Sequence, residues 1–244
     1  MRRIRIFSEV LTDCDFVELD KRNSHYLVNV LRCTVGDKVE VLSGDGRLYS
    51  GILVRDGGRY KIEKLREELV QSECIPVINL YIGVIKGNNF DYAIEKASEL
   101  GVFSVTPFYS DFSNIKVVSH ERIKRFLRIA RSSALQCGRI KIMEINKPIY
   151  LNEVFGHVPF GNNIYLDPSE EERFISDSVD FLKPFNIFSG PEGGFSPKEI
   201  ATFKKNGFMG LSLGSNILRA ETIPIVICTI IQYEYARRKR FYGR

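Results

Sequence analysis

The chain carries two glycine-bearing loops late in its sequence, Ser189-Gly190-Pro191-Glu192-Gly193-Gly194-Phe195-Ser196 and Leu213-Gly214-Ser215-Asn216-Ile217-Leu218-Arg219-Ala220-Glu221-Thr222. Each loop follows an apolar stretch typical of a buried strand, and each precedes a segment typical of a helix. At the first loop, Ser196, Pro197 and Glu199 match the N-cap, N1 and capping-box pattern of a helix start. Two strand–loop–helix turns in succession predict an α/β sheet with a ligand crevice at the carboxyl ends of its strands.

Length and composition allow one large domain or two smaller ones. The chain has 244 residues, of which 44% are hydrophobic, as is ordinary for a globular protein. The basic start lacks the apolar segment of a signal peptide, and the apolar run 223–231 is too short to span a bilayer. The five cysteines are scattered and form no CxxC pair. Unpaired thiols in or near the core, a cytoplasmic location, no membrane and no metal are the expectation.

Charge is distributed unevenly along the chain, whose net charge is +5. Residues 116–141 contain eight Lys or Arg and one Glu, and residues 237–240 form a second basic cluster. This asymmetry favours a polyanion bound on one face. Solvated helix faces would produce the same pattern.

Residues 1–68 are predicted to form a small β-rich domain. A turn at Ser43-Gly44-Asp45-Gly46 joins two strands, and one short helix is expected at residues 24–31. The predicted strands occupy residues 2–7, 38–42, 48–54 and 60–65. Short strands with glycine turns are typical of a small barrel, which binds ligands more often than it catalyses. A spacer or dimerisation domain is the alternative, and residues 67–74 are expected to be the linker.

Residues 75–244 are predicted to form a second, α/β domain. Strands are expected at residues 76–85, 102–107, 163–166, 185–188 and 209–213. Helices are expected at residues 90–100, 120–136, 170–181 and 223–237, with a further helix starting at 197. Alternating strands and helices over this length favour a parallel sheet covered on both faces.

Three common enzyme motifs are missing from the glycine loops. The spacing at residues 190–195 is not the GxGxxG of a Rossmann fold, and no Gly-Lys-Ser/Thr of a P-loop follows. The chain also has no Gly-x-Ser-x-Gly elbow. What remains is a pair of loops suited to a compact, partly apolar cofactor, with basic surface nearby.

Both loops, together with other motifs in the same order, resemble one known family. The further motifs are His25-Tyr26-Leu27-Val28-Asn29-Val30-Leu31-Arg32 with Gly36-Asp37, Lys86-Gly87, Glu95-Lys96-Ala97-Ser98-Glu99-Leu100-Gly101-Val102 and Gln136-Cys137-Gly138-Arg139. In these motifs the chain is similar to the RsmE family, the 16S ribosomal RNA uridine-N3 methyltransferases of the SPOUT superfamily. The resemblance covers nearly the whole length.

The resemblance implies an N-terminal PUA-like β-barrel followed by a SPOUT-type α/β domain with a trefoil knot. It also implies S-adenosylmethionine as the methyl donor and a homodimer whose active site lies near the subunit interface. The substrate would be 16S rRNA or the small ribosomal subunit, and the product 3-methyluridine.

Cofactor-binding residues are predicted from the two loops and the end of one earlier strand. Glycines would let the backbone approach the cofactor, and leucines would enclose its adenine ring. The predicted residues are Leu166, Gly190, Glu192, Gly193, Gly194, Leu213, Gly214, Ile217, Leu218 and Thr222. For each glycine an ordinary turn at a helix start is the alternative.

Arg219 and Glu221 are the predicted catalytic pair. Methylation of uracil N3 requires loss of its proton, and a guanidinium could stabilise the resulting anion on O2 or O4. Glu221 could orient Arg219 or take the proton directly. A structural salt bridge at the start of the last helix is the alternative.

RNA contacts are predicted at basic residues in several motifs, namely Arg2, Arg3, His25, Arg32, Lys86, Lys116 and Arg139. The chain departs from the family pattern at two places. Phe112 follows Asp111 where the family commonly has Arg, and Ser132 stands where it commonly has Glu.

Two other functions remain open from the sequence. The chain could be a SPOUT methyltransferase that modifies a ribose 2′-hydroxyl or a transfer RNA base. It could also be a non-enzymatic ribosome-assembly factor that binds RNA. Measured affinity for S-adenosylmethionine would distinguish the assembly factor from a methyltransferase. Mapping of modified bases in 16S rRNA would distinguish a uridine-N3 methyltransferase from one that modifies another RNA position.

Overall fold

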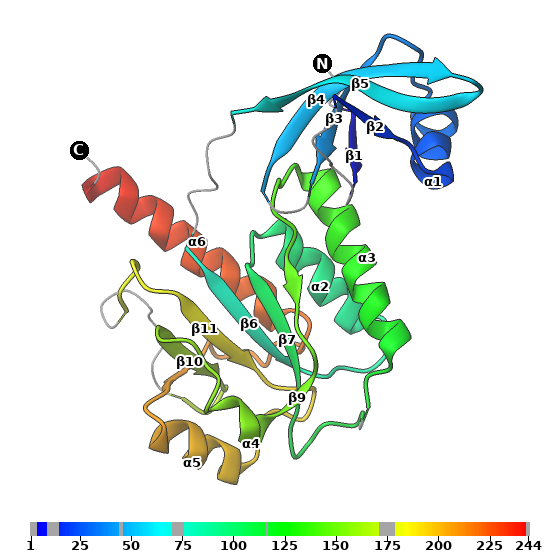
Figure 1. The fold of residues 1–244 in the computed structure, drawn as a ribbon. Coiled ribbons are helices and arrows are strands. Elements are labelled where there is room, and N and C mark those ends of the chain that lie inside the picture. The colour runs from blue at the N-terminus through cyan, green and yellow to red at the C-terminus, as the bar shows by residue number, and fades with distance from the viewer. Residues whose placement is uncertain are drawn as a thin grey trace. The chain divides into compact units, whose positions relative to one another are not determined.

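A computed structural model describes residues 4–8, 15–43, 46–69, 76–115, 117–170 and 179–242 of the chain, with side chains to residue 240. The chain divides into two compact units (Figure 1). Unit 1 comprises Met1–Glu73 and Ala134–Ile142, and unit 2 comprises Cys74–Ser133 and Met143–Arg244. Several sequence predictions lie outside the described residues, namely those at Arg2, Arg3, Cys14, Gly44, Asp45, Cys74, Lys116 and residues 171–178.

Unit 1 contains a curled five-stranded sheet that forms a half-barrel (Figure 1). This sheet corresponds to the small barrel predicted from the sequence. Its strand order is β1-β3-β4-β5-β2, and all neighbours are antiparallel except β1 and β3. The strands are β1 (Arg5–Phe7), β2 (Phe16–Glu18), β3 (Lys38–Leu42), β4 (Leu48–Asp56) and β5 (Arg59–Glu68). Apolar residues of alternating register, such as Val39 and Val41, are completely buried in its core.

Several boundaries in unit 1 differ from the sequence prediction, which also did not include strand β2. The helix α1 (Lys21–His25) begins before residue 24 because Asp20 caps it, accepting a hydrogen bond from the Asn23 backbone N–H at 2.6 Å. It continues as the π-helical turn η1 (Tyr26–Val30). Strand β5 extends to Glu68 because its last residues still pair with β4, although their polar side chains suggested a linker.

Unit 2 contains one parallel seven-stranded sheet, as the alternating pattern predicts. The strand order is β12-β10-β11-β6-β7-β8, and β9 also pairs with β7. Its strands are β6 (Ile78–Gly83), β7 (Ser104–Tyr109), β8 (Glu144–Ile145), β9 (Ile149–Tyr150), β10 (Asn162–Leu166), β11 (Phe185–Ser189) and β12 (Met209–Leu211). The sequence did not predict the short strands β8 and β9, which lack a distinct pattern.

Helices pack on both faces of this sheet (Figure 1). They are α2 (Asn89–Glu99), α3 (His120–Cys137), α4 (Leu151–Val154), α5 (Pro197–Lys205) and α6 (Ile223–Tyr242). Helix α6 contacts α2 and β6, whereas α4 and α5 pack in an aromatic cluster on the sheet. No helix in the described part of the chain is long and apolar enough to cross a membrane.

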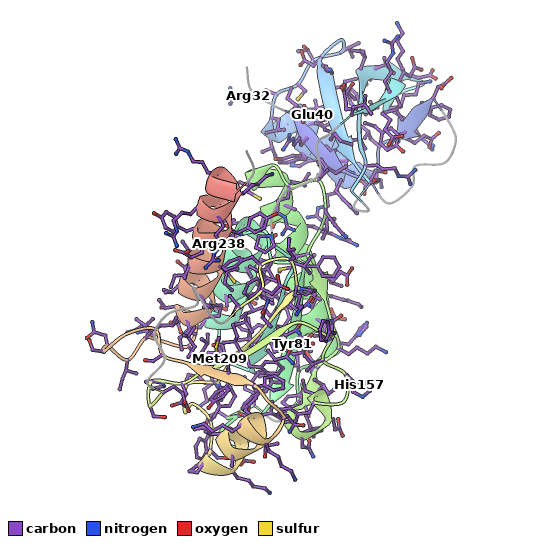
Figure 2. All side chains as sticks on the ribbon, turned by 90° about the vertical axis from the view of Figure 1, so that its left-hand side faces the viewer. Arg32, Glu40, Tyr81, His157, Met209 and Arg238 are labelled. Atoms are coloured by element: carbon purple, nitrogen blue, oxygen red, sulfur yellow. The ribbon has the colours of Figure 1, made fainter. Side chains whose placement is uncertain are left out.

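The aromatic cluster fixes the positions of the strands that carry the glycine loops. Tyr81 of β6, labelled in Figure 2, stacks on Phe188 of β11 with ring centroids 4.2 Å apart. Tyr165 of β10 stacks on Phe203 of α5 at 4.8 Å. Burial of several large rings stabilises this face of the sheet and holds the ends of β10 and β11 in place.

Two predicted helix boundaries are confirmed. The Ser196 hydroxyl accepts from the Glu199 backbone N–H, and the Glu199 carboxylate accepts from the Ser196 N–H, which completes the capping box of α5. Gly101 follows the C-cap of α2 and has a φ of +75°, the left-handed conformation that favours glycine there.

Candidate functional site

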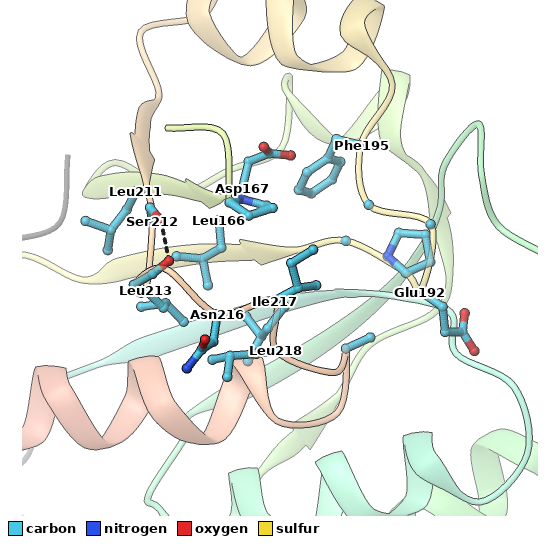
Figure 3. A pocket seen from close by; sticks show the side chains of 18 residues that line it. Leu166, Asp167, Glu192, Phe195, Leu211, Ser212, Leu213, Asn216, Ile217 and Leu218 are labelled. Atoms are coloured by element: carbon cyan, nitrogen blue, oxygen red, sulfur yellow. Dashed lines mark hydrogen bonds between the residues drawn. The ribbon is translucent and has the colours of Figure 1, made fainter. Parts of the chain in front are cut away.

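A cavity of about 250 Å³ lies where β10, β11 and β12 end, and the loops that follow these strands form its walls (Figure 3). Parallel strands present their carboxyl ends at one edge of a sheet, which is where α/β proteins bind ligands. The volume is close to the lower end, about 300 Å³, of typical small-molecule sites. The edge predicted from the sequence as a ligand crevice therefore contains a pocket.

One glycine in each loop adopts a backbone conformation that other residues rarely accept. Gly194 has a φ of +70° and Gly214 a φ of +127°, and an added Cβ at either would meet no atom within 4 Å. At Gly193 an added Cβ would lie 2.9 Å from the Phe112 Cβ. Positive φ angles and close packing explain why glycine occupies these positions.

The loop after β11 is tied to the loops after β6 and β7. The backbone N–H of Lys86 donates to Glu192 Oε1 at 2.9 Å. The Ser196 hydroxyl donates to Asp111 Oδ2 at 2.6 Å, and the Asp111 N–H donates to Glu199 Oε1 at 2.9 Å. These bonds restrain the pocket wall before any ligand arrives, which lowers the entropy cost of binding.

The pocket lining contains both apolar and polar residues. Leu166, Leu213 and Leu218 contribute apolar surface, which suits a flat ring system (Figure 3). Ser212 donates to the Gly214 carbonyl at 3.3 Å and so braces the second loop. Asp167 also lines the cavity, and its Oδ1 accepts hydrogen bonds from the Ser169 N–H and hydroxyl.

A nucleoside with a cationic tail fits this lining. The leucines offer contact to a base, and the glycine backbone offers N–H and C=O groups without side chains in the way. Asp167 and Glu192 also line the cavity and add negative charge to this region, although Asp167 Oδ1 accepts hydrogen bonds from Ser169 and Glu192 Oε1 accepts one from the Lys86 N–H. Within the described ranges, no three His, Cys, Asp or Glu side chains are grouped so that they could hold a metal ion.

Arg219 and Glu221 lie on the turn that connects the pocket to α6. Their side chains approach to 4.0 Å between Arg219 Nη1 and Glu221 Oε1, at the limit of an ion pair. The Arg219 side chain is 86% exposed, whereas that of Glu221 is only 12% exposed. The turn is closed by bonds from the backbone N–H groups of Thr222 and Ile223 to the Arg219 carbonyl. Arg219 is therefore free to contact a ligand, while Glu221 is held against the protein.

Most of the predicted cofactor residues come together in the cavity wall. Thr222 does not line it, and neither do Arg219 and Glu221, although Leu218 and Ala220 beside them do. The predicted residues that do line it are Leu166, Gly190, Glu192, Gly193, Gly194, Leu213, Gly214, Ile217 and Leu218. Residues in the lining that were not singled out as cofactor-binding are Asp167, Pro168, Pro191, Phe195, Leu211, Ser212, Asn216, Ala220 and Ile223. The position of Asp167 and Pro168 directly after a predicted strand was a usable signal for two of them.

The predicted RNA-binding residues differ in exposure. His25 and Arg32 are exposed on unit 1, and Lys86 is exposed on unit 2. His25 Nδ1 lies 2.8 Å from Asn29 Nδ2, and Arg32 has a φ of +59°. Arg139 is only 8% exposed and offers RNA little surface.

Comparisons with known proteins identify relatives for both units. A family described as an RNA methyltransferase domain matches residues 73–232, and a family described as an RNA methyltransferase PUA domain matches residues 19–65. The ribosomal RNA small subunit methyltransferase E of Synechocystis is 30% identical over 86% of this chain and 70% of that protein. Its namesake in Buchnera aphidicola from Schizaphis graminum is 29% identical over 90% and 91%. A methyltransferase structure from Legionella pneumophila with the cofactor SAM bound is 26% identical, with a TM-score of 0.87 over 96% of this chain and 98% of that one.

Proposed function

The chain belongs to the family of ribosomal RNA small subunit methyltransferase E, and from this premise we propose that it methylates N3 of a uridine in 16S rRNA. The methyl donor would be S-adenosylmethionine, which is bound in the related Legionella structure. The observation that carries the proposal is the pocket at the strand ends, because its apolar and glycine-rich walls suit a nucleoside cofactor.

The cofactor would be held by the two glycine loops. Leu166, Leu213 and Leu218 would contact its adenine, and the backbone at Gly190 and Gly194 would hydrogen-bond its polar groups. When bound, S-adenosylmethionine supplies an electrophilic methyl group on a positively charged sulfur. Carboxylates in the lining would favour binding of that charge.

Arg219 would stabilise the uracil anion. A planar guanidinium can donate two hydrogen bonds to O2 or O4 as N3 loses its proton, and this interaction strengthens as charge develops. The exposure of Arg219 supports this role, because a guanidinium engaged in a structural salt bridge would be held closer to its partner than 4.0 Å. Its neighbours Leu218 and Ala220 line the pocket, so a base held by Arg219 would lie close to the cofactor.

Glu221 would orient Arg219. Its carboxylate is largely shielded from solvent and is an acidic group within ion-pair range of the guanidinium. A fixed negative charge there would restrict the directions in which the Arg219 side chain extends. The proton from N3 would then pass to water at the pocket mouth.

A homodimer is part of the proposal. Helix α6 buries one face through Ile227, Cys228 and Ile231, yet Ile230 is 36% and Tyr233 66% exposed on another face. A helix of a monomer seldom presents a second apolar stripe to water. A second copy of the chain would cover this stripe.

Unit 1 would dock the RNA, and the protein would act in the cytoplasm, where ribosomal RNA is modified. The match of this unit to a PUA domain of RNA methyltransferases supports the docking role. His25 and Arg32 are exposed there and would contact phosphates.

The decisive experiment compares 16S rRNA from cells with and without the gene. Nuclease digestion and mass spectrometry should detect 3-methyluridine only in the first sample, and purified protein should restore it in small subunits from the second. The assignment would be refuted if cells without the gene lacked a 2′-O-methyl group and not 3-methyluridine, or if only their transfer RNA had lost a modification. Tight cofactor binding without any methyl transfer would favour the assembly-factor alternative.

A further inference from the structure

An exposed aromatic side chain lies beside the pocket loop. Phe112 is 47% exposed, although burial of a phenylalanine ring is favourable. Its Cβ, Cγ and Cδ2 lie 2.9, 3.5 and 3.7 Å from the position that a Cβ would take at Gly193, which lines the cavity. One side of the ring therefore packs on the pocket loop, and about half of the side chain remains open to solvent.

Hydrogen bonds restrain the turn that carries Phe112. The Ser110 N–H donates to the Ser113 hydroxyl at 2.9 Å, and the Ser113 N–H donates to the Ser110 carbonyl at 3.1 Å. Asp111 is hydrogen-bonded to the N-terminus of α5 through both its backbone N–H, which donates to Glu199, and its carboxylate, which accepts from the Ser196 hydroxyl. A side chain on such a turn can bind a partner without first paying to order its backbone.

Two basic groups lie at the loop that follows β6, which is bonded to the same pocket loop. Lys86 is exposed, and its backbone N–H is bonded to Glu192 of the pocket loop. The Arg122 guanidinium donates to the carbonyl oxygens of Ile85 and Gly87 at 2.9 and 3.2 Å, which places positive charge on the same loop. Phe112 and the Lys86 loop thus both contact the pocket loop, at Gly193 and Glu192. Aromatic rings and cations presented together bind single-stranded nucleic acid, since bases stack and phosphates pair with the charges.

We propose that Phe112 is a substrate-positioning residue, on which a base of the RNA stacks at the rim of the pocket. The proposal rests on the proposed function, since it assigns the RNA side of that site. Uridine N3 is inaccessible in a paired base, so the acceptor must leave its stack. A ring at the rim replaces part of the lost stacking for the extruded base or for its neighbour.

The experiment compares Phe112→Leu with Phe112→Tyr and with the control Phe160→Leu. Phe160 is another exposed phenylalanine, 81% exposed, and it precedes β10, so it lies at the opposite end of the strands from the pocket. Methyl transfer is measured on small ribosomal subunits lacking the modification. Binding is measured with oligouridine and with an abasic oligomer of the same length and charge.

Phe112→Leu should raise the KM for subunits by about 5- to 150-fold, the usual effect of losing one base–aromatic stack, with little change in kcat. Its affinity should fall for oligouridine and stay unchanged for the abasic oligomer. Phe112→Tyr keeps an aromatic ring and should therefore have the KM and the oligouridine affinity of the wild type. Phe160→Leu should also resemble the wild type in both quantities. S-adenosylmethionine affinity should be the same in all four proteins.

Three outcomes would overturn the proposal. Equal losses on the oligouridine and abasic probes would mean that the ring does not stack on a base. A loss of cofactor affinity would mean that Phe112 only supports the Gly193 loop, and dissociation of a dimer would mean that a second copy covers the ring. If the wild type transfers no methyl group, the proposed function fails, while the binding comparison still tests the stack.

Discussion

Arg219 and Gly194 illustrate how single residues determine what the pocket can do. Arg219 is placed by its turn, and its largely exposed guanidinium lies 4.0 Å from Glu221, at the limit of an ion pair, which leaves it able to meet a ligand. Gly194 is required by its backbone angle and not by the size of its neighbours. A change at Arg219 should therefore alter chemistry, and a change at Gly194 should alter the shape of the loop.

Arg219→Ala should fold normally and lose about 100- to 1,000-fold in the rate of single-turnover methyl transfer, because one anion-stabilising donor is removed. Arg219→Lys should recover little of this rate, since a point charge does not reproduce the planar fork. Both are measured at saturating RNA and cofactor. A rate for the alanine variant within a few-fold of wild type would make Arg219 a structural residue.

Gly194→Ala should lower the free energy of unfolding by about 1–2 kcal/mol, the cost of a left-handed conformation for a residue with a Cβ. Gly207→Ala is its matched control, because Gly207 has a φ of +74° and equally open surroundings but does not line the pocket. Calorimetry should show weaker S-adenosylmethionine binding for the first variant alone. Equal affinities would indicate that the Gly194 loop does not hold the cofactor.

Among the elements, β10 and α5 are joined by a polar contact at the edge of the aromatic cluster. The Tyr165 hydroxyl donates to Glu170 Oε1 at 2.6 Å, and Lys204 Nζ lies 3.0 Å from the same oxygen. Burial raises the pKa of Glu170, but the hydrogen bonds from Tyr165 and Lys204 lower it by more, so that the pKa lies below its usual value of 4.5. Burial raises the pKa of Tyr165, so its hydroxyl stays protonated as the donor.

Acid should weaken this contact. Because the folded-state pKa of Glu170 is lowered, its stabilisation is complete above the unfolded pKa and is lost as pH falls through the folded pKa. Urea unfolding at about pH 6 and about pH 4 should show a smaller loss of stability for Glu170→Gln than for the wild type. Glu153→Gln, on an exposed position of α4, should follow the wild type. Identical pH dependence for all three proteins would exclude a contribution from Glu170.

Helix α6 should carry the dimer contact on its exposed apolar stripe. Ile230→Glu should weaken self-association at least about tenfold, because a carboxylate would be buried without a partner. Lys239→Glu, an exposed position about half a turn around the helix from Ile230, is the control. Light scattering at micromolar concentration measures the effect, and an active monomeric wild type would refute the dimer.

At the scale of the whole molecule, unit 1 is assembled from distant parts of the chain. Ile140 is 9% exposed and packs with Leu42 and Leu48, although about a hundred residues separate them in sequence. Removing the first 68 residues would expose Ile140 to solvent. A loss of RNA binding in such a variant could then not be distinguished from a loss of folding. Surface substitutions in the full chain are therefore the cleaner test of RNA docking.

Arg32→Ala and Lys86→Ala should each weaken RNA binding at all sequences and reduce the slope of log affinity against log salt by about 0.7–0.9, one phosphate contact each. Glu18→Ala, an exposed position in β2, provides a control for surface change. Fluorescence anisotropy over a range of salt concentrations measures both quantities. A slope unchanged by both substitutions would remove these residues from the RNA surface.

The trefoil knot implied by the family resemblance stays a prediction. After β12 at one edge of the sheet, the chain returns through the second glycine loop to α6, which contacts α2 and the interior strand β6. Such a return brings the loop after β12 to the loop after β11, with which it forms the pocket.

Local signals determined much of this protein from the sequence alone. Pattern and propensity suffice to predict features that depend on residues only a few positions apart in the sequence. Examples are the capping box at Ser196, the apolar strands β6 and β11 and the helix at Asn89–Glu99. The glycine loops were recognisable for the same reason, and most of the residues predicted from them line the pocket.

Only the tertiary structure decided which distant groups meet. Strand order, the burial of Arg139 and the packing of Phe112 on Gly193 depend on contacts between segments far apart in the chain. No local pattern encodes such pairs, because a residue's own sequence neighbours do not reveal what packs against it. The chain folds its local elements by short-range rules, and the free energy of burying their apolar faces together selects the arrangement that forms the site.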